Sequence, residues 1–131
     1  METTFEYTAR HTPQQNGKVE RNFATLYGRM RAMKKAANFN SEQRSELWTE
    51  AASTATKLDN IIVDNKKDKS AYQKFYGRNT KYEKHLKIFG EVGIVTEKNK
   101  GPKDKISNRG IKCMFVGYAK DHDGDVYRMF N

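Results

Sequence analysis

The sequence predicts an α+β protein, with helices in the first two-thirds of the chain and a small β module in the last third. Between residues 17 and 62, apolar residues recur every three or four positions, which is the period of amphipathic helices. From residue 85 onward they recur at every second position, as in half-buried strands. At 131 residues the chain is long enough for one modest domain or two small ones with a thin core.

The first predicted elements are a short strand and a long helix. Residues 5–9 (FEYTA) alternate in size as a strand does, and the polar segment that follows ends it. Two helix starts fit the residues. Thr12 can cap a helix whose first position is Pro13, or Asn16 can cap a helix that begins at Gly17. The helix then extends to residue 37, and Asn38 ends it.

One face of this helix is apolar and is predicted to be buried against a core. It comprises Val19, Phe23, Leu26, Tyr27, Met30, Met33 and Ala37. At about 100° per residue, four cations point away from that face: Lys18, Arg21, Arg29 and Lys35. Glu20 lies on the shoulder between the apolar and the cationic faces.

A second helix is predicted with Ser41 as its cap and Glu42 in its first turn. Its apolar face comprises Leu47, Trp48, Ala51, Ala55, Leu58 and Ile62, and we expect Trp48 to lie in the core. Residues 63–69 are polar and predict a surface loop. Ser70 can cap a short helix over residues 71–76 that Gly77 closes. Residues 78–84 resemble a linker, so we place the domain boundary there, dividing the chain into 1–83 and 84–131.

The last segment predicts three short strands, over residues 85–96, 111–118 and 126–130. Gly90 and Gly93 mark bends in the first strand, residues 99–110 form a basic, turn-rich connection, and residues 121–124 form a turn. Three short, curved strands predict a small barrel or half-barrel. Cys113 lies within an apolar strand, where burial is expected rather than reactivity.

Several motifs of this chain resemble those of one known family, in the same order. The decapeptide TPQQNGKVER, residues 12–21, resembles the end of the catalytic core of retroviral and retrotransposon integrases, in particular the copia (Ty1/copia) type. HLKIFG, KCMFVGY and YRM match the segment that follows the core in that family. The resemblance implies a truncated RNase H-like core, with one strand and two to three helices, followed by a small SH3-like β module. It also implies the later helix start, with residues 13–16 as a mobile loop.

The resemblance assigns Glu20 as the third carboxylate of the family's Asp, Asp, Glu triad, which holds Mg²⁺ or Mn²⁺. Such sites transfer phosphodiesters with two metal ions roughly 3.5–4 Å apart. Only eleven residues precede Thr12, and none of them is an aspartate. One glutamate cannot hold two such ions against water, so we expect the isolated chain to be catalytically incomplete and to bind no metal stably. Taken by itself, a helical glutamate is more often a solvated acid.

The same resemblance implies DNA contacts around Glu20. Gln14, Gln15 and Asn16 carry uncharged donors and acceptors, and Gly17 allows the backbone to come close to DNA. A plain flexible loop is the equal alternative for these residues. We expect Lys18, Arg21 and Lys35 to contact phosphates. The expected partners are element DNA, target DNA and other integrase subunits, and we also expect self-association, because a partial core exposes apolar helix faces.

Composition agrees with an anionic partner. The net charge is +9, with the basic excess at both ends of the chain, which favours nucleic acid. We expect no membrane partner and an intracellular protein, nuclear in a eukaryotic host, because neither a run of about 18 apolar residues nor a signal-peptide core is present. One cysteine and three scattered histidines predict no structural zinc site, and hence no zinc-binding N-terminal integrase module.

Two further groups of residues have competing interpretations. Asp121, Asp123 and Asp125 resemble the start of a calcium loop, but Gly124 stands at the fourth position rather than the sixth, so an Asp-Gly turn is favoured. Aromatic and basic residues of the β module fit either a nucleic-acid stacking surface or the filling of a small barrel, which we prefer. They are Phe89, Tyr118 and Tyr127 with Lys87, Lys112 and Arg128. The alternative to an integrase fragment is a non-catalytic module of a decayed element that binds nucleic acid or integrase.

Overall fold

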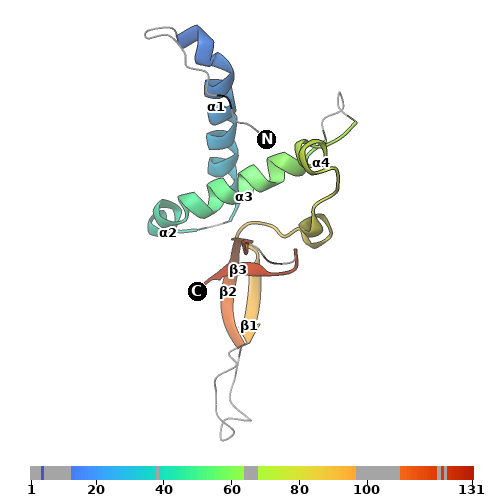
Figure 1. Ribbon diagram of the computed structural model, residues 1–131. Coiled ribbons are helices and arrows are strands. Elements are labelled where there is room, and N and C mark those ends of the chain that lie inside the picture. Colours follow the sequence, from blue (N-terminus) through green and yellow to red (C-terminus); the bar gives the residue numbers. More distant parts are fainter. Residues whose placement is uncertain are drawn as a thin grey trace, which may run out of the picture.

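The computed structural model describes residues 4, 13–37, 39–63, 68–96, 110–120, 122 and 124–131. Figure 1 shows a helical region followed by a three-stranded sheet, in agreement with the predicted α+β class. The elements in chain order are α1 (Pro13–Ala36), α2 (Ser41–Glu46), α3 (Trp48–Ile61), α4 (Ala71–Tyr76), the 3₁₀ helix η1 (Lys81–His85), β1 (Val92–Thr96), β2 (Gly110–Tyr118) and β3 (Tyr127–Phe130). Helix α3 lies between α1 and the sheet, and it packs on α1 and on β2. The predicted strand at residues 5–9 lies outside the described residues, as does Asn38.

Helix α1 begins at Pro13, so the expected start at Gly17 and the loop over residues 13–16 were wrong. Proline at the first helical position has its φ already set for a helix, and its missing N–H would have had no partner there. Gln14 and Gln15 are good helix formers, which outweighs the weak propensity of Asn16 and Gly17. The alternative cap, Thr12, lies outside the described residues.

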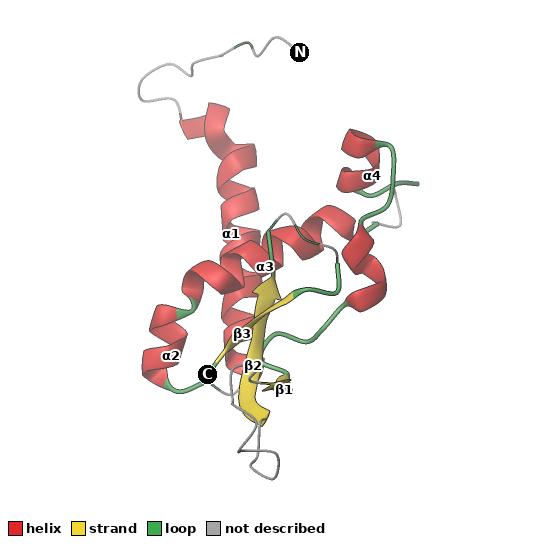
Figure 2. Cartoon of the chain, turned by 60° about the horizontal axis from the view of Figure 1, so that its bottom comes forward, coloured by secondary structure: helices red, strands yellow, loops and turns green. Residues whose placement is uncertain are grey.

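The apolar face of α1 is buried over half of its length. Met30 is buried, and Leu26, Met33 and Ala37 pack against the core. Towards the N-terminus, by contrast, Val19, Phe23 and Tyr27 are each about half exposed. This half of α1 extends away from α3 and the sheet (Figures 1 and 2), and no other element packs on it among the described residues.

The predicted second helix is two helices, with a break at Leu47. Asn40 rather than Ser41 is the N-cap of α2, and its side chain and that of Gln43 form a reciprocal capping box. Leu47 is buried, but Trp48 is 54% exposed, so the expectation that Trp48 lies in the core was wrong. Successive helical residues point about 100° apart, and at this junction the core side is taken by Leu47.

Helix α4 begins and ends at the residues that the sequence predicts. Ser70 Oγ accepts from Gln73 N at 3.1 Å, and Gln73 Oε1 accepts from Ser70 N at 2.9 Å. Gly77 ends the helix with a φ of 69°, a left-handed conformation that glycine adopts without strain. The predicted linker that follows contains most of η1.

The sheet is antiparallel with the order β1-β2-β3. Val92 pairs with Met114, and Met114 pairs with Phe130, with an irregularity between Phe115 and Gly117. The first strand is shorter than predicted, because a turn precedes it: Glu91 N donates to Ile88 O at 2.8 Å, and Gly90 has a φ of 82°. Among the described residues β1 and β3 do not pair with each other, so the sheet is open. Asp121 and Asp123 of the predicted turn lie outside the description.

One core joins the segments on either side of residue 84. Its buried members are Met30, Phe39, Leu47, Ala51 and Ala55 from the helical region, with Phe89 and Val116 from the β segment. Thr54 Oγ1 donates to Val116 O at 3.1 Å, and this bond satisfies a carbonyl beside the strand irregularity. Cys113 is buried, as predicted. Within the described residues, no helix is both long and apolar enough to cross a membrane.

Candidate nucleic-acid interface

Glu20 lies on the exposed N-terminal half of α1. It is seven residues beyond Pro13, which is about 10 Å or two turns along the axis. Among the described residues, no hydrogen bond or ion pair engages its carboxylate. The side chain is therefore displayed to solvent at the part of the helix that extends furthest from the core.

The described residues do not by themselves complete a metal site around Glu20. No group of three or more His, Cys, Asp or Glu side chains is placed among them to hold an ion. A two-ion site of the integrase type needs several carboxylates on facing elements. The role of Glu20 as a ligand of such a site therefore stays a prediction.

The cations predicted to contact DNA fall into two places on α1. Lys18 and Arg21 are exposed near Glu20, and Arg21 Nε donates to Gly17 O at 3.4 Å, which leaves its two terminal nitrogens for other partners. Lys35 is also exposed, but it lies fifteen residues from Glu20, about 22 Å along the axis. The predicted residues therefore form a row along the helix rather than one compact patch.

The remaining predicted contacts belong to the helix instead of a loop. Asn16 is exposed, and a Cβ added at Gly17 would meet no atom within 4 Å, so the backbone there is open to a ligand. Gln14 and Gln15 are helical, while their side chains lie outside the description. The helix gives the backbone of these residues one conformation, whereas the predicted loop would have left it variable.

Further basic residues that the sequence reasoning missed lie beside this row. Tyr27, Met30, Arg31 and Lys34 line a cavity of about 320 Å³ on α1. Lys34 Nζ donates to Arg44 O at 2.9 Å, which brings the last turn of α2 against this end of α1. Arg31 lies eleven residues after Glu20, within about 20° of it around the helix. The spacing between Glu20 and Arg31 could be predicted from the sequence. The contact between Lys34 and Arg44 depends on the tertiary structure.

Arg29 is not a free cation of this surface, although the helical pattern pointed it away from the apolar face. It forms an ion pair with Asp59 of α3. The pair joins the two long helices where they cross, so Arg29 helps to fix the direction of α1.

A second basic group lies where α3 meets the sheet. Arg128 Nη2 lies 2.9 Å from Glu50 Oε1, and Lys57 Nζ donates to Tyr118 O at 3.1 Å. Burial lowers the pKa of Lys57, and the nearby charges of Arg128 and Lys120 add to that effect. Phe89 and Tyr118 are buried, which favours the core alternative over a stacking surface for both.

Comparison with known proteins identifies a similar segment in a retrotransposon polyprotein. The chain is 28% identical over 126 residues to the retrovirus-related Pol polyprotein from transposon TNT 1-94 of Nicotiana tabacum. The match covers 96% of this chain and 9% of that polyprotein. No protein-family model matches the chain, and no solved structure matches it. The similarity supports a retrotransposon polyprotein fragment.

Proposed function

We propose that the chain is the C-terminal part of a copia-type integrase and that it binds DNA along α1. The proposal depends most on one observation: the part of α1 that no described element covers exposes Glu20, Lys18 and Arg21 to solvent. The similarity of nearly the whole chain to part of a Pol polyprotein supports the family. In a eukaryotic host this function belongs in the nucleus.

The arrangement of charge suits the phosphate backbone rather than base recognition. Lys18 and Arg21 form one end of the row on α1, and Arg31 and Lys35 form the other. Cations that contact phosphates release counterions from DNA, so they contribute affinity that falls steeply with salt and carries little sequence information. We therefore expect binding of duplex DNA with weak sequence preference.

Fluorescence anisotropy with a labelled duplex tests this interface. For the intact chain we expect log K to fall linearly with log salt, and the double variant Lys18→Ala/Arg21→Ala should reduce the slope by roughly 2, since each phosphate contact contributes about 0.9. Lys74→Ala/Lys84→Ala is the matched control, because it removes two exposed cations from α4 and η1. Equal slopes for the two double variants, or no binding at low salt, would contradict the proposal.

Glu20→Gln separates DNA binding from catalysis. We expect this variant to bind DNA at least as tightly, because it removes a negative charge from the surface. We also expect the isolated chain to perform no strand transfer on an element-end duplex with Mg²⁺ or Mn²⁺, because Glu20 lacks partner carboxylates among the described residues. Strand transfer that Glu20→Gln abolishes would overturn the expected inactivity.

A second function, association with other integrase subunits, is favoured by the apolar stripe of α1. Val19, Phe23 and Tyr27 are each more than half exposed, and the rings of Phe23 and Tyr27 stack with centroids 6.2 Å apart. An exposed apolar stripe of this kind is typical of a protein interface. Association through Val19 and Phe23 is compatible with DNA binding by Lys18 and Arg21, because these two pairs occupy different sides of α1. Arg31 and Lys34, by contrast, line the same cavity as Tyr27 and lie beside the stripe.

A further inference from the structure

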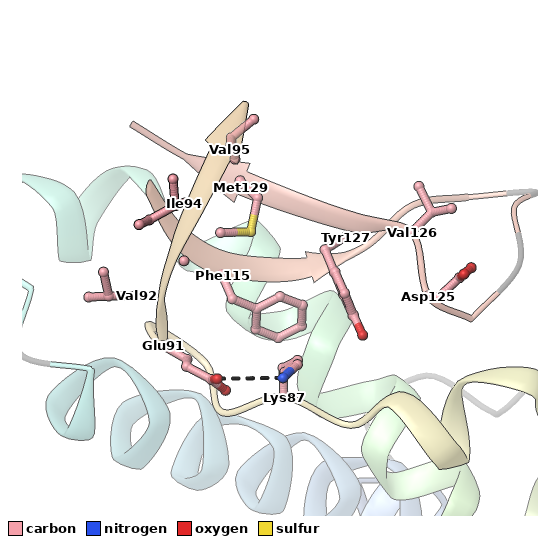
Figure 3. Close-up of a pocket in the computed structure, with 11 residues that line it drawn as sticks. Lys87, Glu91, Val92, Ile94, Val95, Phe115, Asp125, Val126, Tyr127 and Met129 are labelled. Atoms are coloured by element: carbon pink, nitrogen blue, oxygen red, sulfur yellow. Dashed lines mark ion pairs between the residues drawn. The ribbon is translucent and has the colours of Figure 1, made fainter. Parts of the chain in front are cut away.

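The open face of the sheet contains a groove of about 510 Å³, far along the chain from α1. Figure 3 shows β1 on one side of it, Phe115 of β2 at its base, and Met129 and Tyr127 of β3 on the other side. The base is well packed, since Phe115 is buried and meets the Tyr127 ring edge to face at 5.6 Å. Met129 extends towards β1, and a Cβ added at Gly93 would lie 2.9 Å from its Cε.

Strand β1 borders this groove and has an unpaired edge in the described sheet. It pairs with β2 on one side, and no other described strand lies on its second side. Its side chains are exposed on both faces: Ile94 is 77% exposed, Val92 54% and Val95 39%. An exposed apolar edge strand offers free N–H and C=O groups and is a template for another strand.

The charges at one end of the groove indicate the sign of its ligand. Lys87 Nζ lies 3.6 Å from Glu91 Oε1, and Glu91 Oε2 accepts from Ile88 N at 3.1 Å, so this pair is internally satisfied. Asp125 also lines the groove, and its carboxylate has no hydrogen bond or ion pair among the described residues. The groove therefore carries a net negative charge on a chain whose net charge is +9.

We propose that this groove binds an extended, basic peptide segment of a partner protein, which adds as a strand to the free edge of β1. Apolar side chains of the peptide enter the groove over Phe115 and Met129, and a lysine or arginine reaches Asp125. The carboxylates disfavour a nucleic-acid occupant, so this site is separate from the DNA surface of α1 and does not depend on the proposed function.

A designed peptide can probe the groove. In a strand, alternate residues face the same side, so the heptapeptide TLTLTKT, acetylated and amidated, places two leucines and one lysine on one face. Added to the intact ¹⁵N-labelled chain, it should shift the amide resonances of residues 92–95 and of Tyr127 and leave those of α1 unchanged. TLTLTET reverses the charge, and TLTPTKT removes a backbone donor and one leucine; both should bind more weakly.

Asp125→Asn tests the charge, with Asp68→Asn as its matched control because Asp68 is an exposed aspartate remote from the groove in sequence. Since exposed ion pairs contribute little, we expect Asp125→Asn to weaken binding of TLTLTKT about two- to fivefold and to abolish the preference over TLTLTET. Asp68→Asn should change neither. The dispersion of the amide spectrum establishes that each variant is folded.

Several outcomes would overturn this proposal. Absence of shifts at millimolar peptide would exclude a peptide site, and equal binding of the lysine and glutamate peptides would exclude the basic ligand. If the resonances of residues 92–95 shifted with protein concentration in the absence of peptide, a second copy of the chain would be the occupant instead. Displacement of the peptide by duplex DNA with shifts at the same residues would identify a nucleic-acid site.

Discussion

Phe39 is the best-buried large side chain among the described residues, and its ring meets that of Phe89 edge to face at a centroid distance of 5.7 Å. It lies just after α1, outside any helix, yet it connects the helical region to the turn before β1. Aromatic pairs of this geometry contribute about 0.5–1.5 kcal/mol beyond the area that they bury. The position of this one side chain therefore helps to hold the two segments together.

We expect Phe39→Ala to lower the free energy of unfolding by about 3–5 kcal/mol, the usual loss for a buried phenylalanine. Trp48→Ala should lower it by about 1 kcal/mol or less, because the indole is largely exposed and removing it leaves no cavity. Urea unfolding followed by circular dichroism measures both values without depending on the tryptophan. A larger loss for Trp48→Ala than for Phe39→Ala would show that Trp48 is the core residue after all.

Glu50 gives the fold a specific sensitivity to acid. The hydrogen bond from Thr49 Oγ1, at 2.6 Å, and the charge of Arg128 lower the pKa of the Glu50 carboxyl below its ordinary value of 4.5. A depressed carboxyl pKa contributes stability that is fully present above the unfolded-state pKa and is lost as the pH falls through the folded-state pKa.

Glu50→Gln should therefore be less stable than the unmodified chain near neutral pH, and the difference should shrink as the pH falls below about 4.5, the ordinary pKa of this carboxyl. Because Arg128 is half exposed, we expect a difference of about 1 kcal/mol or less at neutral pH. Urea unfolding of the two proteins across this pH range measures it. A difference that stays constant with pH would rule out a role for the charge of Glu50.

At the scale of elements, α1 determines how the candidate interface is presented. With a start at Pro13, residues 13–20 form a continuous rod, and Glu20 is fixed relative to Lys18 and Arg21. Its direction is set at the other end, where Met30 packs into the core and Arg29 pairs with Asp59. The candidate interface thus lies on the N-terminal half of α1, and the C-terminal half of the same helix packs in the core.

Glycine substitutions distinguish this helix from the expected loop. Gly17→Ala should raise the free energy of unfolding by about 0.5–1 kcal/mol, because alanine is the better helix former and its Cβ meets no neighbour within 4 Å. Gly90→Ala should lower it by about 2 kcal/mol or more, since Gly90 has a φ of 82° and its Cβ would overlap Ala37. Thermal unfolding of both variants provides the comparison, and destabilisation by Gly17→Ala would favour the loop.

In the molecule as a whole, one core connects the helical region to the β segment. Phe89 and Val116 of the β segment pack with Met30, Leu47 and Ala51 of the helical region. The predicted boundary at residue 84 is thus crossed by apolar contacts as well as by the bond from Thr54 to Val116. We infer that the helices and the sheet unfold together rather than as independent domains.

Apolar surface left outside this core should make the chain associate with itself. Sedimentation velocity should show species larger than 15.2 kDa whose population grows with protein concentration. Phe23→Lys should reduce that population, because it places a charge within the exposed stripe of α1. Ile94→Lys is the matched variant on β1, and if it reduced association more than Phe23→Lys, the sheet edge would be the contact between copies.

Features that depend on local interactions could be predicted from the sequence alone. The sequence identified α4 with its cap at Ser70 and its end at Gly77, the α+β order of elements, and the burial of Cys113, since capping, periodicity and polarity act over a few residues. It also marked Glu20 and the cations of α1 as candidates, whose function remains a proposal. Three features emerged only from the folded chain: Trp48 is exposed, Arg29 pairs with Asp59, and Phe89 and Val116 join the helical core. These outcomes depend on which element covers which face, and periodicity predicts an apolar face without specifying its partner.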